Sequence, residues 1–256
     1  MRVIPIPCLK DNYAYLLIAD QGGAVVVDPS EAGPVEAALA REQVELSAIW
    51  LTHHHLDHVG GVPDLCATRP ELPVLGSRYD LQLSRIPSQT AGLSEGDALQ
   101  FDGKTVELLE IPGHTLGAIA FVVAGNLFSG DTLFLAGCGR VFEGTMAMMQ
   151  RSLAKLRELP ASTRLYCGHE YTVSNLRFAA AVEPDSEAIE ARLSWAAALR
   201  DGNEPTMGTA LGDELTTNPF LRWDDRAVIA RAREWGSEGG DPASVFGALR
   251  KAKDKF

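Results

Sequence analysis

The chain contains a histidine-rich run whose spacing could hold a metal ion. Residues 52–60 read Thr-His-His-His-Leu-Asp-His-Val-Gly and directly follow a short apolar stretch. In an extended segment, residues two apart share a side, so His53 and His55 can face one metal ion together with a third imidazole. Asp57 and His58 can face a second point nearby. Because clustering four imidazoles and a carboxylate without a metal is costly, this run predicts a metal site.

Other candidate ligands lie later in the chain, each after an apolar run. His114 stands in Pro-Gly-His-Thr, Asp131 in Ser-Gly-Asp-Thr and His169 in Cys-Gly-His-Glu. Alone, such a histidine is more often a core or surface residue, and an aspartate after glycine is usually a turn residue. Beside the histidine run they become candidate ligands, and the Asp131 carboxylate could bridge two cations. His54 falls on the opposite side of the extended segment, where we expect it to support the site or the fold.

Composition narrows the class of protein. The 256 residues are 46% hydrophobic and 22% charged, which is ordinary for a globular domain. The net charge is −11, whereas a dedicated nucleic-acid-binding protein is expected to carry many basic residues that contact phosphates. Four widely spaced cysteines form no Cys-x-x-Cys, as is typical of reduced thiols in a cytoplasm. There is no signal-peptide core and no apolar run of about 20 residues, so we expect a soluble cytoplasmic protein that does not bind membranes. We also expect no nucleic-acid partner, because of the charge, and a monomer.

The elements that must position these residues follow from apolar periodicity. Short apolar runs bounded by turn residues predict strands at 12–18, 24–27, 49–51, 74–76, 105–111, 119–123, 127–129 and 165–167. Helical spacing and composition predict helices at 34–41, 145–159, 175–182, 187–199, 224–235 and 241–253. We therefore expect an α/β (α+β) catalytic domain over residues 1–170, with ligand-bearing loops at strand ends, and a helical domain over residues 171–256.

The motifs resemble those of the metallo-β-lactamase superfamily. The Thr-His-His-His-Leu-Asp-His segment looks like that superfamily's THxHxDH signature, and the segments around His114, Asp131 and His169 match its later motifs in order. The resemblance implies an αββα sandwich with a two-metal site at one edge. It implies that the first metal is held by His53, His55 and His114, the second by Asp57, His58 and His169, with Asp131 bridging them.

A closer resemblance, to the hydroxyacylglutathione hydrolase family, runs through nearly the whole chain. The segments that carry it are GCGRVFEGT at 137–145, CGHEYT at 167–172, TNPFLR at 217–222 and RKAKDKF at 250–256. It implies hydrolysis of S-(2-hydroxyacyl)glutathione thioesters, chiefly S-D-lactoylglutathione to glutathione and D-lactate, in methylglyoxal detoxification by the glyoxalase pathway. Some members carry Tyr where this chain has Phe142, which excludes a hydroxyl contact to glutathione there.

Four residues are candidate contacts for the glutathione half of such a substrate. They are Arg140, Tyr171, Arg250 and Lys253. Arg250 and Lys253 are three apart on a helical pattern, so they share a face and could clamp a carboxylate. Without the resemblance, the favoured interpretation of these two residues is that they are solvent-exposed at the C-terminal end of a helix, where positive charge suits the helix dipole. The Tyr171 phenol could contact the substrate, or the ring could simply pack at the edge of the site.

The expected chemistry uses two divalent metal ions per chain, with zinc expected and iron or manganese as the alternatives. A hydroxide bridging them, from water whose pKa falls to about 7, would attack the thioester carbonyl, with Asp57 and Asp131 as catalytic carboxylates. Three other functions fit parts of the pattern. They are a one-iron persulfide dioxygenase, a two-metal RNA phosphodiesterase and a non-catalytic metal-stabilised binding protein. The helical tail argues against the first, the acidic charge against the second and the complete ligand set against the third.

Overall fold

The computed structural model describes residues 1–20 and 22–256, which divide into two compact units. Unit 1 comprises Met1–Glu110, Leu116–Gly130 and Tyr166–Glu170. Unit 2 comprises Ile111–Thr115, Asp131–Leu165 and Tyr171–Phe256. The units interleave along the chain, and the division into domains at residue 170 stays a prediction.

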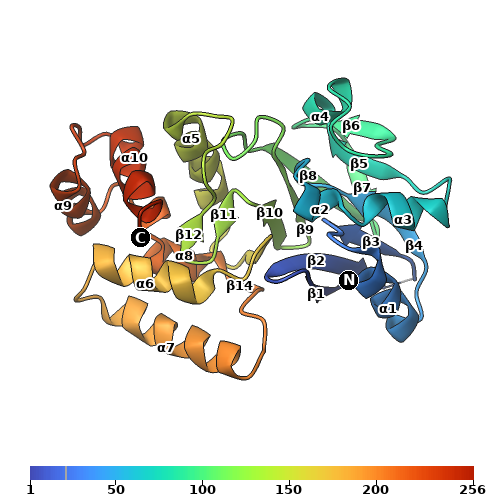
Figure 1. Cartoon of the computed structure of the whole chain (residues 1–256), viewed down its shortest axis with the longest axis horizontal. Helices are drawn as coiled ribbons and strands as arrows, with labels where there is room; N and C mark the ends of the chain where they lie inside the picture. The colour runs from blue at the N-terminus through green and yellow to red at the C-terminus, as the bar shows by residue number, and fades with distance from the viewer. Residues whose placement is uncertain (21) are drawn as a thin grey trace. The chain divides into compact units, whose positions relative to one another are not determined.

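A six-stranded sheet forms one layer of unit 1 (Figure 1). Its strands, in spatial and chain order, are β1 (Arg2–Cys8), β2 (Asn12–Ile18), β3 (Ala24–Val27), β4 (Leu46–Trp50), β5 (Val74–Ser77) and β6 (Ala91–Leu93). The pairs β1–β2 and β2–β3 are antiparallel, whereas β3 to β6 run parallel. Parallel strands bring the loops at their carboxyl ends to a single edge of the sheet. The helices of this unit are α1 (Ala32–Glu42), α2 (Leu56–Val59), α3 (Val62–Ala67) and α4 (Arg78–Gln82).

A second sheet of unit 1 packs against the first. Its strands are β7 (Leu99–Phe101), β8 (Lys104–Glu110), β9 (Ile119–Val123) and β10 (Asn126–Gly130), followed in spatial order by the end of β13 (Arg164–Cys167). Neighbouring strands from β7 to β10 pair antiparallel. Trp50 of β4 stacks on Phe121 of β9 with ring centroids 5.0 Å apart, so the two sheets face each other.

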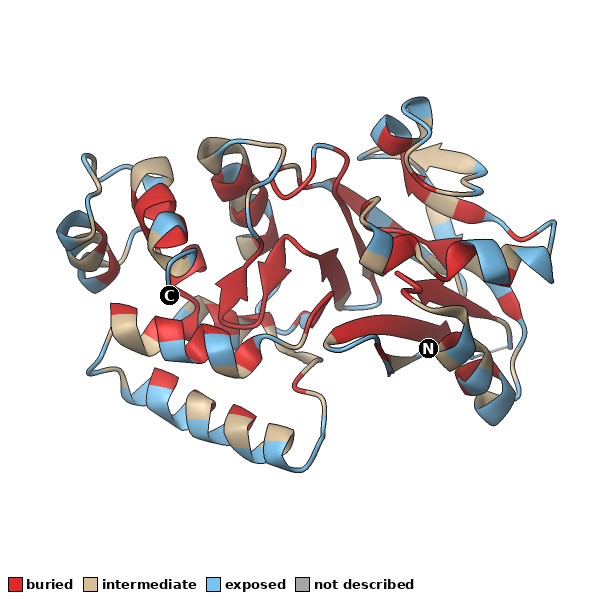
Figure 2. Cartoon of the chain, in the orientation of Figure 1, coloured by how far each residue is buried: buried red, intermediate tan, exposed pale blue. Residues whose placement is uncertain are grey.

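Strand β2 shows how the sequence builds these layers. Every residue of β2 is buried (Figure 2), so the strand is covered on both faces. Leu16 belongs to the apolar cluster that includes Val35 of α1 and Leu65 of α3. On the opposite face, the Tyr15 ring lies 5.6 Å from Phe128 of β10. Because side chains alternate along a strand, one face of β2 packs on helices and the other on the second sheet.

Strand β1 is not predicted by the sequence patterns, because Pro5 and Pro7 interrupt its apolar run. Proline has no N–H to donate and is confined to the edges of sheets. β1 is the edge strand of its sheet and pairs only with β2 among the described strands. The two prolines are two residues apart, so both can occupy positions that donate no hydrogen bond to the partner strand.

Unit 2 is mainly helical. It contains the hairpin β11 (Leu133–Phe134) and β12 (Gly137–Cys138), the first part of β13 paired with β14 (Thr209–Ala210), and the 3-10 helix η1 (Pro219–Leu221). Its α-helices are α5 (Met146–Arg157), α6 (Thr172–Val182), α7 (Glu187–Asp201), α8 (Leu211–Thr217), α9 (Arg226–Glu234) and α10 (Pro242–Lys253). The C-terminal helices predicted from composition are therefore present, and α8 is an additional one. No helix of residues 1–20 or 22–256 has the length and apolar character needed to cross a bilayer.

The buried carboxylate of Glu214 on α8 organises part of unit 2. It accepts hydrogen bonds from the Ala136 backbone N–H at 2.6 Å and the Asn218 side-chain amide at 3.0 Å, and it forms an ion pair with Arg192 of α7. Burial raises the pKa of the Glu214 carboxyl, and the adjacent guanidinium opposes that rise. Since Ala136 lies between β11 and β12, these bonds hold the hairpin against α8.

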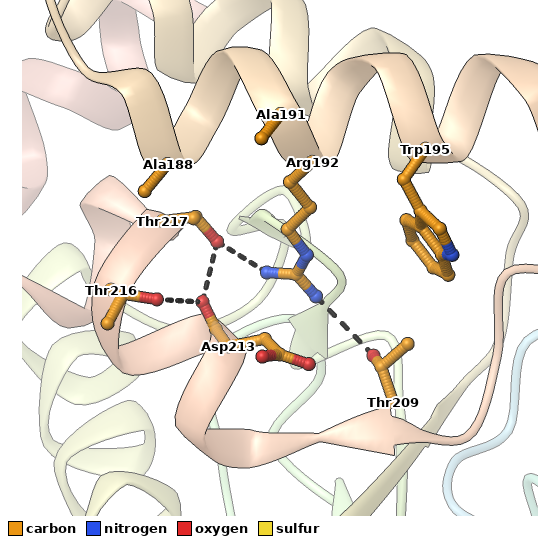
Figure 3. A pocket seen from close by; sticks show the side chains of 8 residues that line it. All are labelled: Ala188, Ala191, Arg192, Trp195, Thr209, Asp213, Thr216 and Thr217. Atoms are coloured by element: carbon orange, nitrogen blue, oxygen red, sulfur yellow. Dashed lines mark hydrogen bonds between the residues drawn. The ribbon is translucent and has the colours of Figure 1, made fainter.

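Arg192 forms the inner wall of a pocket of about 430 Å³ between α7 and α8 (Figure 3). Its guanidinium donates to the hydroxyls of Thr217 and, at 3.4 Å, Thr209. Trp195 lines the same pocket and is partly exposed. The buried arginine is thus neutralised by Glu214 and held by hydroxyl acceptors, as burial of a charge requires.

Candidate metal centre

The carboxyl ends of β3 and β4 form the base of the site in unit 1. Asp28 follows β3, and the histidine run follows β4. One Asp28 carboxylate oxygen accepts from the Thr52 backbone N–H at 2.8 Å, and the other accepts from the Thr52 hydroxyl at 2.6 Å. The Asp28 N–H in turn donates to the Trp50 carbonyl at 3.0 Å. The parallel pairing of β3 and β4 therefore sets where the histidine run begins.

The histidines that share a side in the sequence pattern lie together. His53 Nε2 is 3.1 Å from His55 Nδ1, and the rings of His53 and His58 have centroids 4.1 Å apart. Helix α2 begins at Leu56, so Asp57 and His58 lie in one helical turn directly after the extended segment.

Asp57, His58 and His169 form a compact group of donor atoms. Asp57 Oδ2 lies 3.3 Å from His169 Nε2 and 3.8 Å from His58 Nε2. One ligand atom from each of the three lies within 4.8 Å of the others. His58 and His169 are both buried. Two imidazole nitrogens and a carboxylate oxygen thus converge from α2 and from the loop after β13.

Two further carboxylates fix the protonation of these imidazoles. His58 Nδ1 bonds to Asp28 Oδ2 at 2.9 Å, and His169 Nδ1 bonds to Asp11 Oδ1 at 2.9 Å. An ionised carboxylate only accepts, so each Nδ1 carries a proton, and in the neutral ring Nε2 is then the nitrogen with a lone pair. This is how metal-binding histidines are held in known sites. The donor set therefore fits divalent metal ions by chemistry and by orientation.

Asp11 and Asp28 hydrogen-bond to two expected ligands, but the sequence motifs do not point to either carboxylate. Asp28 directly follows the apolar run 24–27, and Asp11 lies in the turn before β2. A carboxylate at the end of a buried strand, beside a strand that ends in histidines, is the signal that could have identified Asp28. Nothing in the sequence pairs Asp11 with His169, which lies 158 residues away.

The turn after α2 brings it against the segment that follows β3. Gly60 and Gly61 have φ angles of −60° and −81°, which are open to any residue, so backbone conformation does not require glycine there. A Cβ on Gly61 would lie 2.8 Å from the Pro29 carbonyl oxygen, and the Gly61 N–H donates to that same oxygen. Glycine is required there for close approach, which holds α2 near Asp28.

The loop carrying His169 is tied to its neighbours through the backbone. The Tyr13 N–H donates to the Gly168 carbonyl at 2.9 Å, and the Gly168 N–H donates to the Gly130 carbonyl at 3.0 Å. Gly130 has a φ of 50°, and a Cβ there would overlap the Thr52 side chain. Glycine is therefore required at this position, both for the backbone conformation and for the close approach to Thr52.

His54 extends toward α4. Its Nδ1 lies 3.5 Å from Asp80 Oδ1, and the Asp80 side chain is fully buried. Arg85 Nη1 approaches the same oxygen at 3.6 Å, and the Ser77 hydroxyl donates to Oδ2 at 3.0 Å. His54 thus contacts a buried carboxylate of its own, in keeping with the expected supporting role.

Unit 2 carries the other two expected ligands side by side. His114 Nε2 lies 3.5 Å from Asp131 Oδ2, and His114 Nδ1 bonds to the Arg140 carbonyl oxygen at 2.8 Å. A carbonyl oxygen only accepts, so Nδ1 is again the protonated nitrogen. His114 and Asp131 are buried. His114 therefore resembles His58 and His169 of unit 1: its Nδ1 donates a hydrogen bond, and its Nε2 lies near a carboxylate.

Arg250 is buried and is not a solvated helix end. It donates from Nη1 to the Cys138 carbonyl at 2.8 Å and from Nη2 to Asp254 Oδ1 at 3.1 Å. Its guanidinium also lies 5.2 Å from the Phe220 ring centroid. Burial raises the pKa of the neighbouring Cys138 thiol to about 11, which leaves that thiol protonated at neutral pH.

Lys253 lies one turn further along α10 in an aromatic setting. Its ammonium is 5.3 Å from the ring centroids of both Phe178 and Phe256 and donates to the Ser174 carbonyl at 3.2 Å. Burial, with a smaller contribution from Arg250, lowers the pKa of Lys253 to about 8.

The remaining expected contacts are more exposed. The Tyr171 ring packs edge-on against Phe134, with centroids 5.5 Å apart, and is partly exposed. The Arg140 side chain is 65% exposed, with Nε 3.6 Å from Asp254 Oδ1. The Phe142 ring is largely exposed, with its centroid 5.2 Å from that of His114.

Comparison with known proteins identifies the fold and the family. A family model described as the metallo-beta-lactamase superfamily matches residues 10–169, and one described as the hydroxyacylglutathione hydrolase C-terminus matches residues 170–256. A hydroxyacylglutathione hydrolase of Synechococcus sp. strain JA-2-3B'a(2-13) is 49% identical over 100% of both chains. Another, of Alkalilimnicola ehrlichii, is 48% identical over 99% of both. The solved structure of TTHA1623, in a di-iron-bound form, shares 28% identity and a TM-score of 0.61, covering 86% of this chain and 100% of that one.

The fold and the matched superfamily define the protein class as a metallo-β-lactamase-type metalloprotein, with a binuclear site for divalent metal ions. Within this superfamily, the chain belongs to the hydroxyacylglutathione hydrolase family. The family and the fold class expected from the sequence motifs are thereby confirmed.

The Asp11–His169 hydrogen bond leads to a prediction about metal affinity. In Asp11→Asn, the partner of His169 Nδ1 loses its charge, and we expect metal affinity at this cluster to fall by about 10- to 100-fold. The measurement is competition for metal against a chromogenic chelator. Asp64→Asn, an exposed carboxylate in the first turn of α3, is the control and should match wild type. Equal affinity in both variants would contradict the orienting role of Asp11.

Proposed function

We propose that this chain hydrolyses S-(2-hydroxyacyl)glutathione thioesters, chiefly S-D-lactoylglutathione to glutathione and D-lactate. The observation that carries the proposal is the convergence of Asp57, His58 and His169, with both imidazoles oriented by carboxylates. The full-length relatives named hydroxyacylglutathione hydrolase supply the substrate class. In this role the chain would remove the thioester formed from methylglyoxal in the glyoxalase pathway.

The proposed ligand sets are those that the resemblance to the metallo-β-lactamase superfamily implies. The first metal ion is assigned to His53, His55 and His114, the second to Asp57, His58 and His169, and the bridging position to Asp131. Zinc is the proposed metal, with iron and manganese as alternatives, because imidazole and carboxylate donors suit all three. When bound, the two ions would supply Lewis-acid polarisation of the thioester carbonyl and a lowered pKa for attacking water.

The chain's own residues then have distinct tasks. Asp28 and Asp11 keep the protons of His58 and His169 on Nδ1. The Asp57 carboxylate contributes negative charge beside His58 and His169, and the Asp131 carboxylate contributes it beside His114. Asp57 and Asp131 are proposed as the catalytic carboxylates. No residue has to protonate the leaving group, because a thiol with a pKa of about 8.5 departs readily as thiolate.

The glutathione half is assigned to the cationic and polar groups of unit 2. Arg140 and Tyr171 are partly exposed and could reach the peptide, and Lys253 supplies an ammonium for a carboxylate. Arg250 acts from a buried position, where it holds the β12 backbone and Asp254. The catalytic domain at 1–170, the glutathione-binding domain at 171–256, the monomeric state and the cytoplasmic location stay predictions.

Hydrolysis of S-D-lactoylglutathione tests the proposed function directly. Purified protein with its metals counted should consume the thioester, followed by the loss of its absorbance, with nearly two metals per chain. His55→Ala should lose at least about 100-fold in kcat/KM and part of its metal, because an imidazole ligand is removed. Absence of hydrolysis by wild type with two bound metals would contradict the substrate assignment, and glutathione persulfide under oxygen would be assayed next.

Lys253 leads to a prediction about pH dependence. Its pKa of about 8 means that the ammonium is charged at pH 7 and mostly neutral at pH 9. If that charge binds the substrate carboxylate, kcat/KM should fall several-fold over this range relative to Lys253→Arg, whose guanidinium stays charged. Steady-state kinetics of both proteins from pH 6 to 9.5 provide the measurement. Parallel profiles for the two proteins would contradict the assigned contact.

A further inference from the structure

Unit 1 exposes a large apolar side chain inside its histidine motif. Leu56 is 78% exposed and lies between His55 and Asp57 at the start of α2. A single exposed leucine is ordinary on a protein surface. Leu56 differs from an ordinary surface leucine because it lies between two expected ligand residues, at the start of the helix that carries Asp57 and His58.

A second exposed leucine lies in the turn that supports the same site. Leu9 is 55% exposed and begins the turn between β1 and β2. In that turn Asp11 holds His169, and at its end the Asn12 side-chain amide donates to Asp57 O at 3.0 Å and Asp57 Oδ2 at 3.1 Å. The turn therefore lies against the first turn of α2, and each of the two segments presents an exposed leucine.

Leu9 also has a backbone conformation that leucine disfavours. Its φ is 49°, in the left-handed region where glycine and asparagine are the usual residues. Its N–H donates to Glu31 Oε2 at 2.6 Å, which holds the turn in this geometry. The side chain lies outside the buried apolar cluster of unit 1, so core packing does not explain why a leucine occupies this position.

We propose that Leu56 and Leu9 form the contact surface for the acyl group of the thioester and set its preference. The inference rests on the proposed function. The glutathione half is anionic and polar, and cationic side chains suit it, whereas the carbon substituent of a 2-hydroxyacyl group is apolar. Leu56 directly precedes Asp57, and Leu9 lies in the turn that leads to Asn12, which bonds to Asp57; both leucines match that substituent. The preferred substrates are then 2-hydroxyacyl thioesters that carry an alkyl group at C2, over the unsubstituted glycolyl thioester.

The test is a comparison of acyl groups in full-length, metal-loaded protein. S-glycolylglutathione, S-D-lactoylglutathione and S-D-2-hydroxybutanoylglutathione differ by successive carbons, and kcat/KM is measured for each. The variants are Leu56→Ser and the double variant Leu56→Ser/Leu9→Asn. The control is Leu83→Ser, which removes a leucine that is as exposed as Leu9, at 55%, at the end of α4.

We expect wild type to favour the alkyl-substituted thioesters, because an apolar contact discriminates by roughly 10-fold or more per carbon when it is fully buried. Leu56→Ser should lower the lactoyl-to-glycolyl ratio of kcat/KM by about threefold and the double variant by about tenfold. Metal content should stay at two per chain, and Leu83→Ser should keep the wild-type ratio. If the double variant loses metal, the lactoyl-to-glycolyl ratio of Leu56→Ser alone tests the inference.

Two results would overturn this inference while leaving the proposed function intact. One is an unchanged lactoyl-to-glycolyl ratio in both leucine variants. The other is an equal fall for all three thioesters, which would mean that the leucines stabilise the site without contacting the acyl group. A wild-type protein that hydrolyses none of the three thioesters would contradict the proposed function itself, and the acyl contact with it.

Discussion

The buried carboxylate of Asp28 is the group on which the site in unit 1 depends. A buried anion is costly unless donors surround it, and here the donors come from the short segment 52–58: the Thr52 N–H, the Thr52 hydroxyl and His58 Nδ1. The beginning and end of the histidine run are thereby fixed to the same carboxylate. His53, His55 and Asp57 lie between these two anchors, so their positions follow from them. The parallel pairing of β3 with β4 supplies the geometry, because it brings Asp28 and Thr52 to one sheet edge.

Much of this arrangement is readable from the sequence. Periodicity indicates most of the longer strands and helices, and the spacing of the run at 52–60 indicates a metal site. The supporting residues are not readable in the same way. Asp28 and Asp11 are 30 and 158 residues from the imidazoles that they orient, and only the folded chain brings them together. The sequence does not predict β1, because a strand with prolines is tolerated only at the edge of a sheet. A sequence pattern does not say which strand lies at that edge.

Burial also changes the interpretation of charged residues in unit 2. The sequence pattern of Arg250 and Lys253 is equally typical of a solvated helix end, yet Arg250 is almost fully buried and bonded to the β12 backbone. Arg192 and Glu214 form a buried ion pair, which joins α7 to α8 and to the β11–β12 hairpin. That hairpin lies between Asp131 and Arg140 in the chain. Paired buried charges therefore position the segment that carries both residues.

The measurement that tests this account most directly is anomalous X-ray diffraction from crystals of the metal-loaded protein. Data collected on both sides of the absorption edge of the bound metal locate each ion and the side chains around it. The account predicts two ions per chain, with His58 and His169 bound through Nε2 while their Nδ1 atoms remain bonded to Asp28 and Asp11. It further predicts an ion at His53, His55 and His114, and Asp131 between the two ions. Ligation of His58 or His169 through Nδ1, or a single ion held by other residues, would contradict it.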